Sequence, residues 1–289
     1  MKKENMKRLV SLIVVLSFQV ALADNVNVIV GKNDLVTVNA DATNIPSKFK
    51  KIVNAIGIMG VGCTATHVGD GYVVTAGHCI GAYDYHVDDQ PCGSNLYDIN
   101  WGYREGVEPY LVSKCERIIS AYTSDTDGVD YALLKVSPAP PYKIKLDFSR
   151  LRSKVGTIIT IFSHVDEKPL SWSKNCRIQS VEQGVLSMDY FHHICDTMGG
   201  SSGALIINPL TLKAVGIHGG GVSAEFNTEG VTLNYGTYLF KTPLLDLLQK
   251  LLPQEEKETP SQFSLPTKDV QNAVAPVLPS NIKATNTNM

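Results

Sequence analysis

The apolar residues of this 289-residue chain fall in short runs that are separated by turn-forming residues. Runs of strand length bounded by Gly, Pro, Asn or Asp are typical of an all-β protein. The clearest strand candidates are residues 52–59, 72–75, 131–136, 157–162, 204–207, 213–217 and 236–240. Leucines at helical spacing in 244–252 predict one amphipathic helix after the last strand. Hydrophobic residues make up 44% of the chain, which allows a substantial core.

The first 23 residues have the features of a removable signal peptide. Four basic residues precede the apolar run 9–18, and Ala21-Leu22-Ala23 fits a cleavage site made of small residues. The run is short for a membrane-spanning helix and is interrupted by polar residues. We therefore expect a secreted or periplasmic protein without a stable membrane anchor.

Charge and cysteine content exclude some classes of function. The formal net charge is −2, which gives no argument for nucleic-acid binding. Six cysteines in an exported chain predict up to three disulfides, and fifteen pairings are open. His192-His193 with Cys195 has no matching second ligand cluster, so we expect neither a metal nor another cofactor.

Three separated segments carry chemistry. Residues 199–204, Gly-Gly-Ser-Ser-Gly-Ala, predict a tight turn that presents a nucleophilic serine, although such a cluster alone is more often a linker. Residues 75–79, Thr-Ala-Gly-His-Cys, follow an apolar run, and residues 130–136 carry an aspartate at the start of another. Together the segments supply histidine, aspartate and serine in that chain order.

In these motifs and their order, the chain resembles the chymotrypsin-like serine proteases over about residues 28–252. Residues 196–203 and 216–220 look most like the secreted bacterial branch that includes the glutamyl endopeptidases. The resemblance implies two packed six-stranded Greek-key β-barrels, residues 28–145 and 146–252, with the helix at the end of the second. It also implies a monomer that cleaves protein or peptide substrates without a cofactor.

By this resemblance, His78, Asp130 and Ser202 form a catalytic triad. A serine hydroxyl is a poor nucleophile near neutral pH, so it needs the imidazole as a base and the carboxylate to fix the imidazole tautomer. Backbone N–H groups of Gly200 and Ser202 would form the oxyanion hole. Ser202 is favoured over Ser201 because only Ser202 has glycine directly after it and another glycine two places before.

Other polar residues near these motifs are expected to be structural. His67, His86, His164, His192 and His193 lack a comparable context, and we predict surface or structural roles for them. Asp125 and Asp127 precede Asp130 in a polar loop, where they are expected to form turns.

The resemblance also implies disulfide pairings. The family often bridges the positions of Cys63 and Cys79, which would hold the loop that carries the histidine. Cys176 and Cys195 would bridge the approach to the nucleophile turn, and Cys92 and Cys115 are the two that remain.

Substrate preference stays open between two alternatives. Thr197 and His218 match positions that help to bind an acidic side chain in glutamyl endopeptidases. Asp196, six residues before Ser202, has the spacing of the aspartate that binds lysine or arginine in trypsin. A carboxylate facing the pocket would repel a glutamate substrate by about 4 kcal/mol at 4 Å and an effective dielectric near 20, so the direction of the Asp196 side chain decides between the two. We favour the acidic alternative, because the Asp-Thr-x-Gly-Gly run also resembles the glutamyl branch, in which this aspartate need not line the pocket. A noncatalytic protease homologue that acts as a binding module is a further alternative.

Both ends of the chain carry processing hypotheses. Val28-Ile29 with Asn33-Asp34 resembles a glutamyl endopeptidase start, so residues 24–27 would form a short propeptide, whereas a mature chain beginning at Asp24 is the alternative. Residues 253–289 are polar, contain several prolines and lack periodicity, which predicts a disordered tail.

Overall fold

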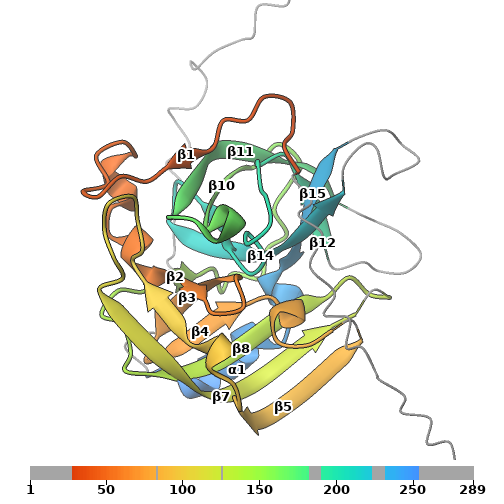
Figure 1. Ribbon diagram of the computed structural model, residues 1–289. Helices are drawn as coiled ribbons and strands as arrows, with labels where there is room; N and C mark the ends of the chain where they lie inside the picture. Colours follow the sequence, from red (N-terminus) through yellow and green to blue (C-terminus); the bar gives the residue numbers. More distant parts are fainter. Residues whose placement is uncertain (1–27, 83, 125, 182–189, 223–231, 254–289) are drawn as a thin grey trace, which may run out of the picture. The chain divides into compact units, whose positions relative to one another are not determined.

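The computed structural model describes residues 28–253, except 83, 125, 182–189 and 223–231 (Figure 1). The predicted signal peptide, the propeptide and the tail beyond Pro253 therefore lie outside the described residues. Described strands form two separate sheets, and the described part of the chain contains one α-helix, α1 (Leu244–Leu251). None of the helices in that part has the length and apolar character needed to cross a bilayer.

The first sheet closes into a barrel. It contains β2 (Ile56–Met59), β3 (Thr64–Gly69), β4 (Tyr72–Thr75), β5 (Tyr85–Pro91), β6 (Ile99–Trp101), β7 (Leu111–Thr123) and β8 (Asp130–Ser137). Six of these strands form the ring β7-β6-β2-β3-β4-β8, which the β7–β8 pairing closes. Strand β7 can pair with both neighbours because it is 13 residues long: its start pairs with β6, and its later part pairs with β8 and with the outer strand β5.

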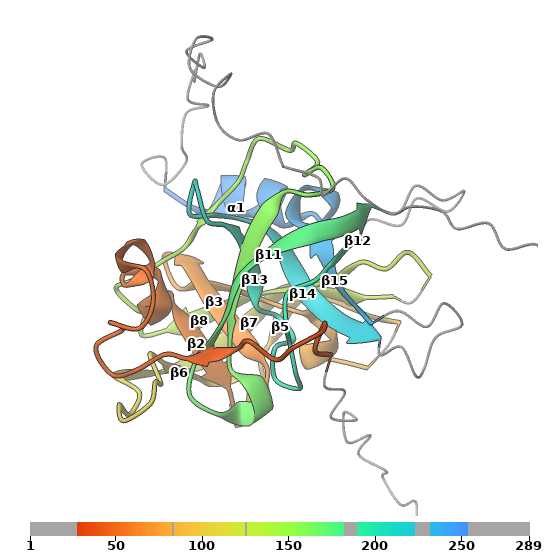
Figure 2. The ribbon, with the colours of Figure 1, turned by 90° about the horizontal axis from the view of Figure 1, so that it is seen from above.

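The second sheet closes in the same way. It contains β1 (Val36–Thr37), β9 (Lys145–Leu146), β10 (Ile158–Ser163), β11 (Ser171–Val181), β12 (Tyr190–His193), β13 (Leu205–Asn208), β14 (Lys213–Val222) and β15 (Leu233–Tyr238). The ring β11-β10-β13-β14-β15-β12 is closed by the β11–β12 pairing, while β1 and β9 attach to β11 and β14. The two closed six-stranded antiparallel barrels confirm the expected architecture (Figures 1 and 2).

Several element boundaries differ from the sequence-based expectation. The run 52–59 begins as the 3-10 helix η2 (Ile52–Ala55), and the run 236–240 ends in η7 (Leu239–Lys241). A short apolar run is compatible with either state, so its length alone does not define the strand. Residues 28–37, which we placed with the first barrel, pair with the second sheet instead, because β1 adds to the edge of β11. The other 3-10 helices among the described residues are η1 (Ser47–Phe49), η3 (Gly77–Cys79), η4 (Asn95–Tyr97) and η5 (Val165–Glu167).

The helix α1 buries one apolar face, as its leucine spacing predicts. Leu244, Leu245 and Leu248 are buried and belong to the larger core cluster. That cluster includes most of the first-barrel core together with second-barrel residues such as Ile207 and Ala214. The helix therefore belongs to a core cluster that residues of both barrels share.

All three expected disulfides are present. Cys63 is bonded to Cys79, Cys92 to Cys115, and Cys176 to Cys195. The first joins the start of the β3 segment to η3, and the second joins the outer strand segment to β7. The third links β11 to the segment that follows β12.

Candidate active site

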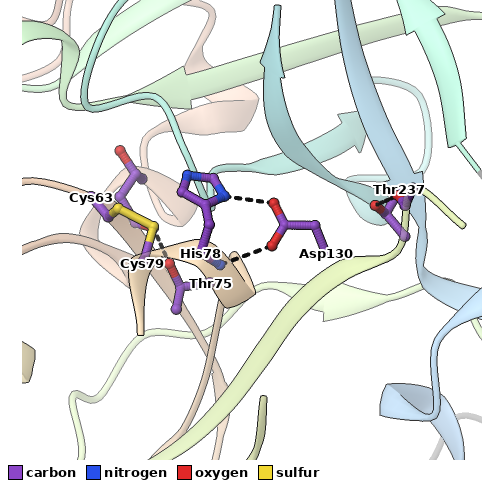
Figure 3. A network of polar contacts seen from close by, with 8 residues as sticks. Cys63, Thr75, His78, Cys79, Asp130 and Thr237 are labelled. Carbon is purple, nitrogen blue, oxygen red and sulfur yellow. Dashed lines mark hydrogen bonds and ion pairs between the residues drawn. A yellow bond between two sulfur atoms is a disulfide. The ribbon is translucent and has the colours of Figure 1, made fainter. Parts of the chain in front are cut away.

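His78 is presented by a short turn at the end of a buried strand. Strand β4 is buried along its whole length, and η3 begins two residues after its end. At Gly77 a Cβ atom would lie 2.1 Å from the Tyr122 carbonyl oxygen, so only glycine allows the turn to approach β7 this closely. The Cys63–Cys79 disulfide holds the other side of the histidine (Figure 3).

Asp130 binds His78 twice (Figure 3). The His78 Nδ1 atom lies 2.7 Å from Asp130 Oδ2, and the His78 backbone N–H donates to Oδ1 at 3.0 Å. Asp130 is the first residue of β8, whose pairing with β4 places it beside η3. A carboxylate accepts hydrogen bonds, so Nδ1 of His78 carries the proton and Nε2 keeps a lone pair that can accept one.

The charge of Asp130 decides the acidity of His78. Burial alone would lower the pKa of His78, but the Asp130 charge and hydrogen bond raise it above its usual value of 6.5. The carboxylate therefore stabilises the imidazolium that forms when Nε2 takes a proton.

The two candidate serines have different environments. Ser201 is fully buried, and its Oγ atom lies 3.0 Å from Ser163 Oγ at the end of β10. Ser202 is partly exposed. These environments support Ser202 over Ser201 as the serine available to a substrate.

The carbonyl groups of the nucleophile turn, residues 198–203, point inward to donors. Gly199 O accepts from Asp166 N at 2.6 Å, and Ser201 O accepts from Ala204 N at 3.0 Å. A trans peptide places its N–H opposite to its C=O, so the N–H groups of Gly200 and Ser202 point the other way. Within the described chain, neither of these N–H groups has a hydrogen-bond partner. Two outward N–H groups with one residue between them can receive an oxyanion.

The backbone conformation at position 200 and the atoms around it both require glycine. Its φ of 85° lies in the left-handed region. A Cβ atom at this position would also lie 2.2 Å from the His164 carbonyl oxygen. The turn therefore accepts no side chain at Gly200.

Main-chain contacts place the nucleophile turn against the first barrel. Thr64 N, in β3, donates to Ser202 O at 2.9 Å. A Cβ atom on Gly203 would lie 2.1 Å from Thr75 Oγ1 and 2.8 Å from Ala76 N, two residues before His78. The serine segment and the histidine segment thus meet, although they come from different barrels.

Thr197 and His218, the residues predicted to bind substrate, lie close to the site in the second barrel. Thr197 is buried and donates from its Oγ1 to Asn234 Oδ1 at 2.6 Å. The Asn234 side-chain amide in turn donates to Val28 O and Cys195 O. His218 O accepts from Gly203 N at 2.9 Å, directly after Ser202.

A second histidine fixes the protonation of His218. Cys195 N donates to His193 Nδ1 at 3.3 Å, so the proton of neutral His193 is on Nε2. That Nε2 lies 3.3 Å from His218 Nδ1, and donation along this contact leaves the proton of His218 on Nε2; the Tyr235 backbone carbonyl is a second acceptor near both rings. Burial, together with the positive charge of His78, lowers the pKa of His218 to about 3, and burial also lowers that of His193. Both rings are neutral at neutral pH.

Asp196 is turned toward the N-terminal segment. Its Oδ1 accepts from Val30 N at 2.8 Å, and its Oδ2 accepts from Asp34 N at 2.9 Å. The residue is 4% exposed, and burial raises its pKa while the two N–H donors oppose that shift. These contacts give no support to the alternative in which Asp196 binds a basic substrate side chain.

The other predicted structural residues behave as expected where they are described. His67 is buried and accepts from Gly71 N, and His86 is exposed on β5. Asp127 Oδ1 accepts from Val129 N two residues later, which is a turn contact, whereas Asp125 lies outside the described residues.

Three residues of the site have contacts that the sequence does not indicate. His193 was expected only to be a structural or surface residue, and Thr64 and Asn234 were not among the predicted site residues. No local motif marks these positions, because their partners are distant in the chain.

One group of side chains has the composition of a metal site. The Cys63, His78 and Cys79 ligand atoms lie within 4.8 Å of one another. Both cysteines are in a disulfide, which removes the thiolates that a metal would need. The group does not fit a metal ion.

Comparisons with known proteins show the family and the fold of the chain. The family model for a trypsin-like peptidase domain matches residues 63–217, more than half of the chain. No curated protein sequence matches this chain. A solved structure of a Glu endopeptidase in complex with MPD is 17% identical with a TM-score of 0.54, and the match covers 78% of this chain and 99% of that one.

Two further solved structures are similar to a lesser degree. The protease Anisep from Arthrobacter nicotinovorans is 17% identical with a TM-score of 0.48, covering 65% of this chain and 91% of that one. The Ser343Ala mutant of Rv3671c from M. tuberculosis H37Rv is 15% identical with a TM-score of 0.48, covering 75% and 97%. At these identities the Glu endopeptidase match supports the fold.

Proposed function

Because this chain belongs to the trypsin-like peptidase family, we propose that it is a serine endopeptidase in which His78, Asp130 and Ser202 form the catalytic triad. The coarser conclusion, a protease of this fold, follows from the family match. The observation that carries the triad proposal is the 2.7 Å contact between His78 Nδ1 and Asp130 Oδ2. The residues just before His78 also pack against Gly203, which directly follows Ser202.

The proposed reaction has two steps, acylation of Ser202 by the substrate and hydrolysis of the resulting ester, and His78 transfers a proton in both. The Ser202 Oγ attacks the scissile carbonyl carbon while His78 Nε2 takes the hydroxyl proton. The tetrahedral intermediate then expels the amine, which receives that proton from His78, and an ester to Ser202 remains. Water attacks the ester with the same help from His78, and the carboxylic acid product leaves.

The oxyanion of each tetrahedral intermediate would be bound by the N–H groups of Gly200 and Ser202. Fixed donors aimed at developing charge stabilise the transition state, and loss of one such donor raises the barrier by roughly 3 to 4 kcal/mol in comparable enzymes. The inward hydrogen bonds of the turn carbonyls support this role, because they hold both N–H groups outward before a substrate binds.

We further propose that the enzyme prefers an acidic residue before the cleaved bond. The arrangement of His193 and His218 supports this preference, because it leaves the proton of His218 on Nε2, where it can be donated to a carboxylate. Thr197 adds no hydrogen-bond donor to this preference, because its hydroxyl hydrogen already goes to Asn234 Oδ1. Asp196 supports the preference indirectly, since both of its oxygens already accept backbone N–H groups.

Export and maturation form part of the same proposal. Three disulfides are typical of proteins outside the reducing cytoplasm, which supports secretion or a periplasmic location. We propose that mature protein begins at Val28, since its N–H and C=O bind Thr197 O and N in an isolated β-bridge. The mature enzyme would act as a monomer on protein or peptide substrates.

The proposal is tested with a fluorophosphonate probe and peptide substrates. Mature protein should be labelled, the Ser202→Ala variant should not, and the Ser201→Ala variant should keep labelling as the matched control. Peptides that differ only before the cleaved bond should show Glu preferred to Gln and Arg. Absence of labelling in folded wild-type protein would favour a noncatalytic binding module, and a preference for Arg would overturn the acidic assignment.

A further inference from the structure

Thr64 is a fully buried residue of the first barrel with hydrogen bonds to two segments of the second. Its Oγ1 donates to Gly200 O at 2.7 Å and accepts from His164 N at 2.9 Å. Its backbone N–H donates to Ser202 O at 2.9 Å. One threonine therefore binds two carbonyl groups of the nucleophile turn.

The direction of these bonds is fixed. A backbone N–H can only donate, so the hydroxyl oxygen of Thr64 accepts from His164 and its hydrogen goes to Gly200 O. This hydroxyl bridges the end of β10 to the nucleophile turn. The site is crowded, because a Cβ on Gly200 would touch the His164 carbonyl at 2.2 Å.

The peptide that Thr64 holds lies between the two oxyanion donors. Gly200 O belongs to the Gly200–Ser201 peptide, and the N–H groups of Gly200 and Ser202 flank it. A change in the ψ angle of Gly200 or the φ angle of Ser201 that the other angle does not compensate turns this peptide relative to its neighbours, and so changes the direction of the two N–H groups relative to each other. Gly200 resists rotation weakly by itself, because glycine has the widest conformational freedom.

Thr64 is also tied to the histidine segment. Its carbonyl accepts from Thr75 Oγ1 at 2.9 Å, at the end of the strand that leads to His78. The preceding residue, Cys63, is bonded to Cys79, which directly follows His78. The same residue thus contacts the segment of the base and the segment of the nucleophile.

From these contacts we infer that Thr64 is a positioning residue, whose side-chain hydroxyl holds the oxyanion-forming turn in its active geometry against the histidine segment. The inference rests on the proposed serine-protease function. It assigns a catalytic effect to a residue that does not touch the substrate, acting through the Gly200–Ser201 peptide.

The test compares three variants of the mature enzyme. Thr64→Val removes the hydroxyl at nearly constant volume, and Thr64→Ser keeps it. Thr66→Val is the matched control, since Thr66 is buried two residues further along β3 and has no hydrogen bond to the nucleophile turn among the described residues. Steady-state kinetics, thermal unfolding and binding of a peptide boronic acid are measured for each.

We expect Thr64→Val to lower kcat by about 10- to 100-fold, as when one oxyanion donor is partly misplaced, with KM changed by about twofold or less. Boronic acid affinity should fall in parallel with kcat/KM, because the boronate adduct is bound like the transition state. Thr64→Ser and Thr66→Val should stay within about threefold of wild type. A wild-type kcat in Thr64→Val, or an equal loss in Thr64→Ser, would overturn the inference.

A crystal structure of Thr64→Val separates this inference from the proposed function. A reoriented Gly200–Ser201 peptide in the variant supports the positioning role whether or not the wild-type enzyme cleaves peptides. An unchanged peptide overturns it. Failure of the wild-type protein to react with a fluorophosphonate would instead count against the serine-protease proposal alone.

Discussion

His193 Nε2 lies 3.3 Å from His218 Nδ1 in the interior of the second barrel. Both rings are fully buried, and both pKa values lie below the ordinary value of 6.5. Both rings are therefore uncharged at neutral pH, so any contribution to substrate binding comes from the hydrogen bonds that they donate and not from a positive charge. Four predictions follow from this pair and from the other contacts of the site.

The Glu preference should depend on His218. A hydrogen bond to a charged group is worth about 1.5 to 3 kcal/mol, so His218→Leu should lower kcat/KM for a Glu peptide by about 10- to 100-fold. The matched Gln peptide should lose much less, because its side chain is neutral. Equal losses for both peptides would place His218 outside substrate recognition. His86→Leu, on the exposed outer strand, is the control variant.

The acid limb of the pH profile should report His78. Nε2 must be unprotonated to act as the base, so the labelling rate should rise with pH through a pKa above 6.5. In Asp130→Asn the raising effects of the carboxylate are lost while burial remains, so the pKa should fall below 6.5 and kcat should drop by about 10⁴-fold. The pH dependence of fluorophosphonate labelling measures both. An unshifted limb in the variant would mean that another group titrates.

Asp196 should stabilise the N-terminal segment without selecting substrates. Asp196→Ala removes the acceptor for Val30 N and Asp34 N, so the free energy of unfolding should fall by about 1 to 2 kcal/mol in urea titrations. The ratio of Glu to Arg cleavage should stay unchanged. A shift in that ratio would show that the carboxylate faces the substrate after all. Asp41→Asn, an exposed acid of the N-terminal region, is the control.

Two disulfides should contribute similarly to stability and differently to activity. The Cys63–Cys79 and Cys92–Cys115 bridges span 16 and 23 residues, so by the chain-entropy model each should stabilise by about 3 kcal/mol. Replacing Cys63 and Cys79 by alanine should also lower kcat, because that bridge flanks His78 and Thr64. Replacing Cys92 and Cys115 should leave kcat near wild type. Chemical denaturation and steady-state kinetics on both double variants test this contrast.

Local patterns in the sequence were sufficient for the all-β class, for several of the strands and for the motif residues, whereas the disulfide pairing came from the family resemblance. Short apolar runs bounded by turn residues predicted an all-β chain because their period and length depend on neighbouring residues alone. The same reasoning was wrong for 52–55, and the barrel bounds implied by the resemblance were wrong for residues 28–37. In the first case a buried run formed a 3-10 helix, and in the second a segment joined the other sheet.

The direction of a side chain could not be predicted in the same way. Asp196 had the spacing of a trypsin-type specificity residue, yet its oxygens bind Val30 N and Asp34 N, more than 160 residues earlier in the chain. Thr64 carried no motif at all, and its importance comes from partners more than 90 residues away. Such contacts form only when distant strands pack together.

The sequence by itself determined the chemical groups and their order: a histidine after β4, an aspartate opening β8, and a glycine-flanked serine before β13. Only the tertiary structure decided which of these groups meet, which way Asp196 faces, and which nitrogen of His218 carries the proton. The physical reason is that residue type and spacing set local conformation, whereas hydrogen-bond direction depends on donors and acceptors brought together by barrel closure.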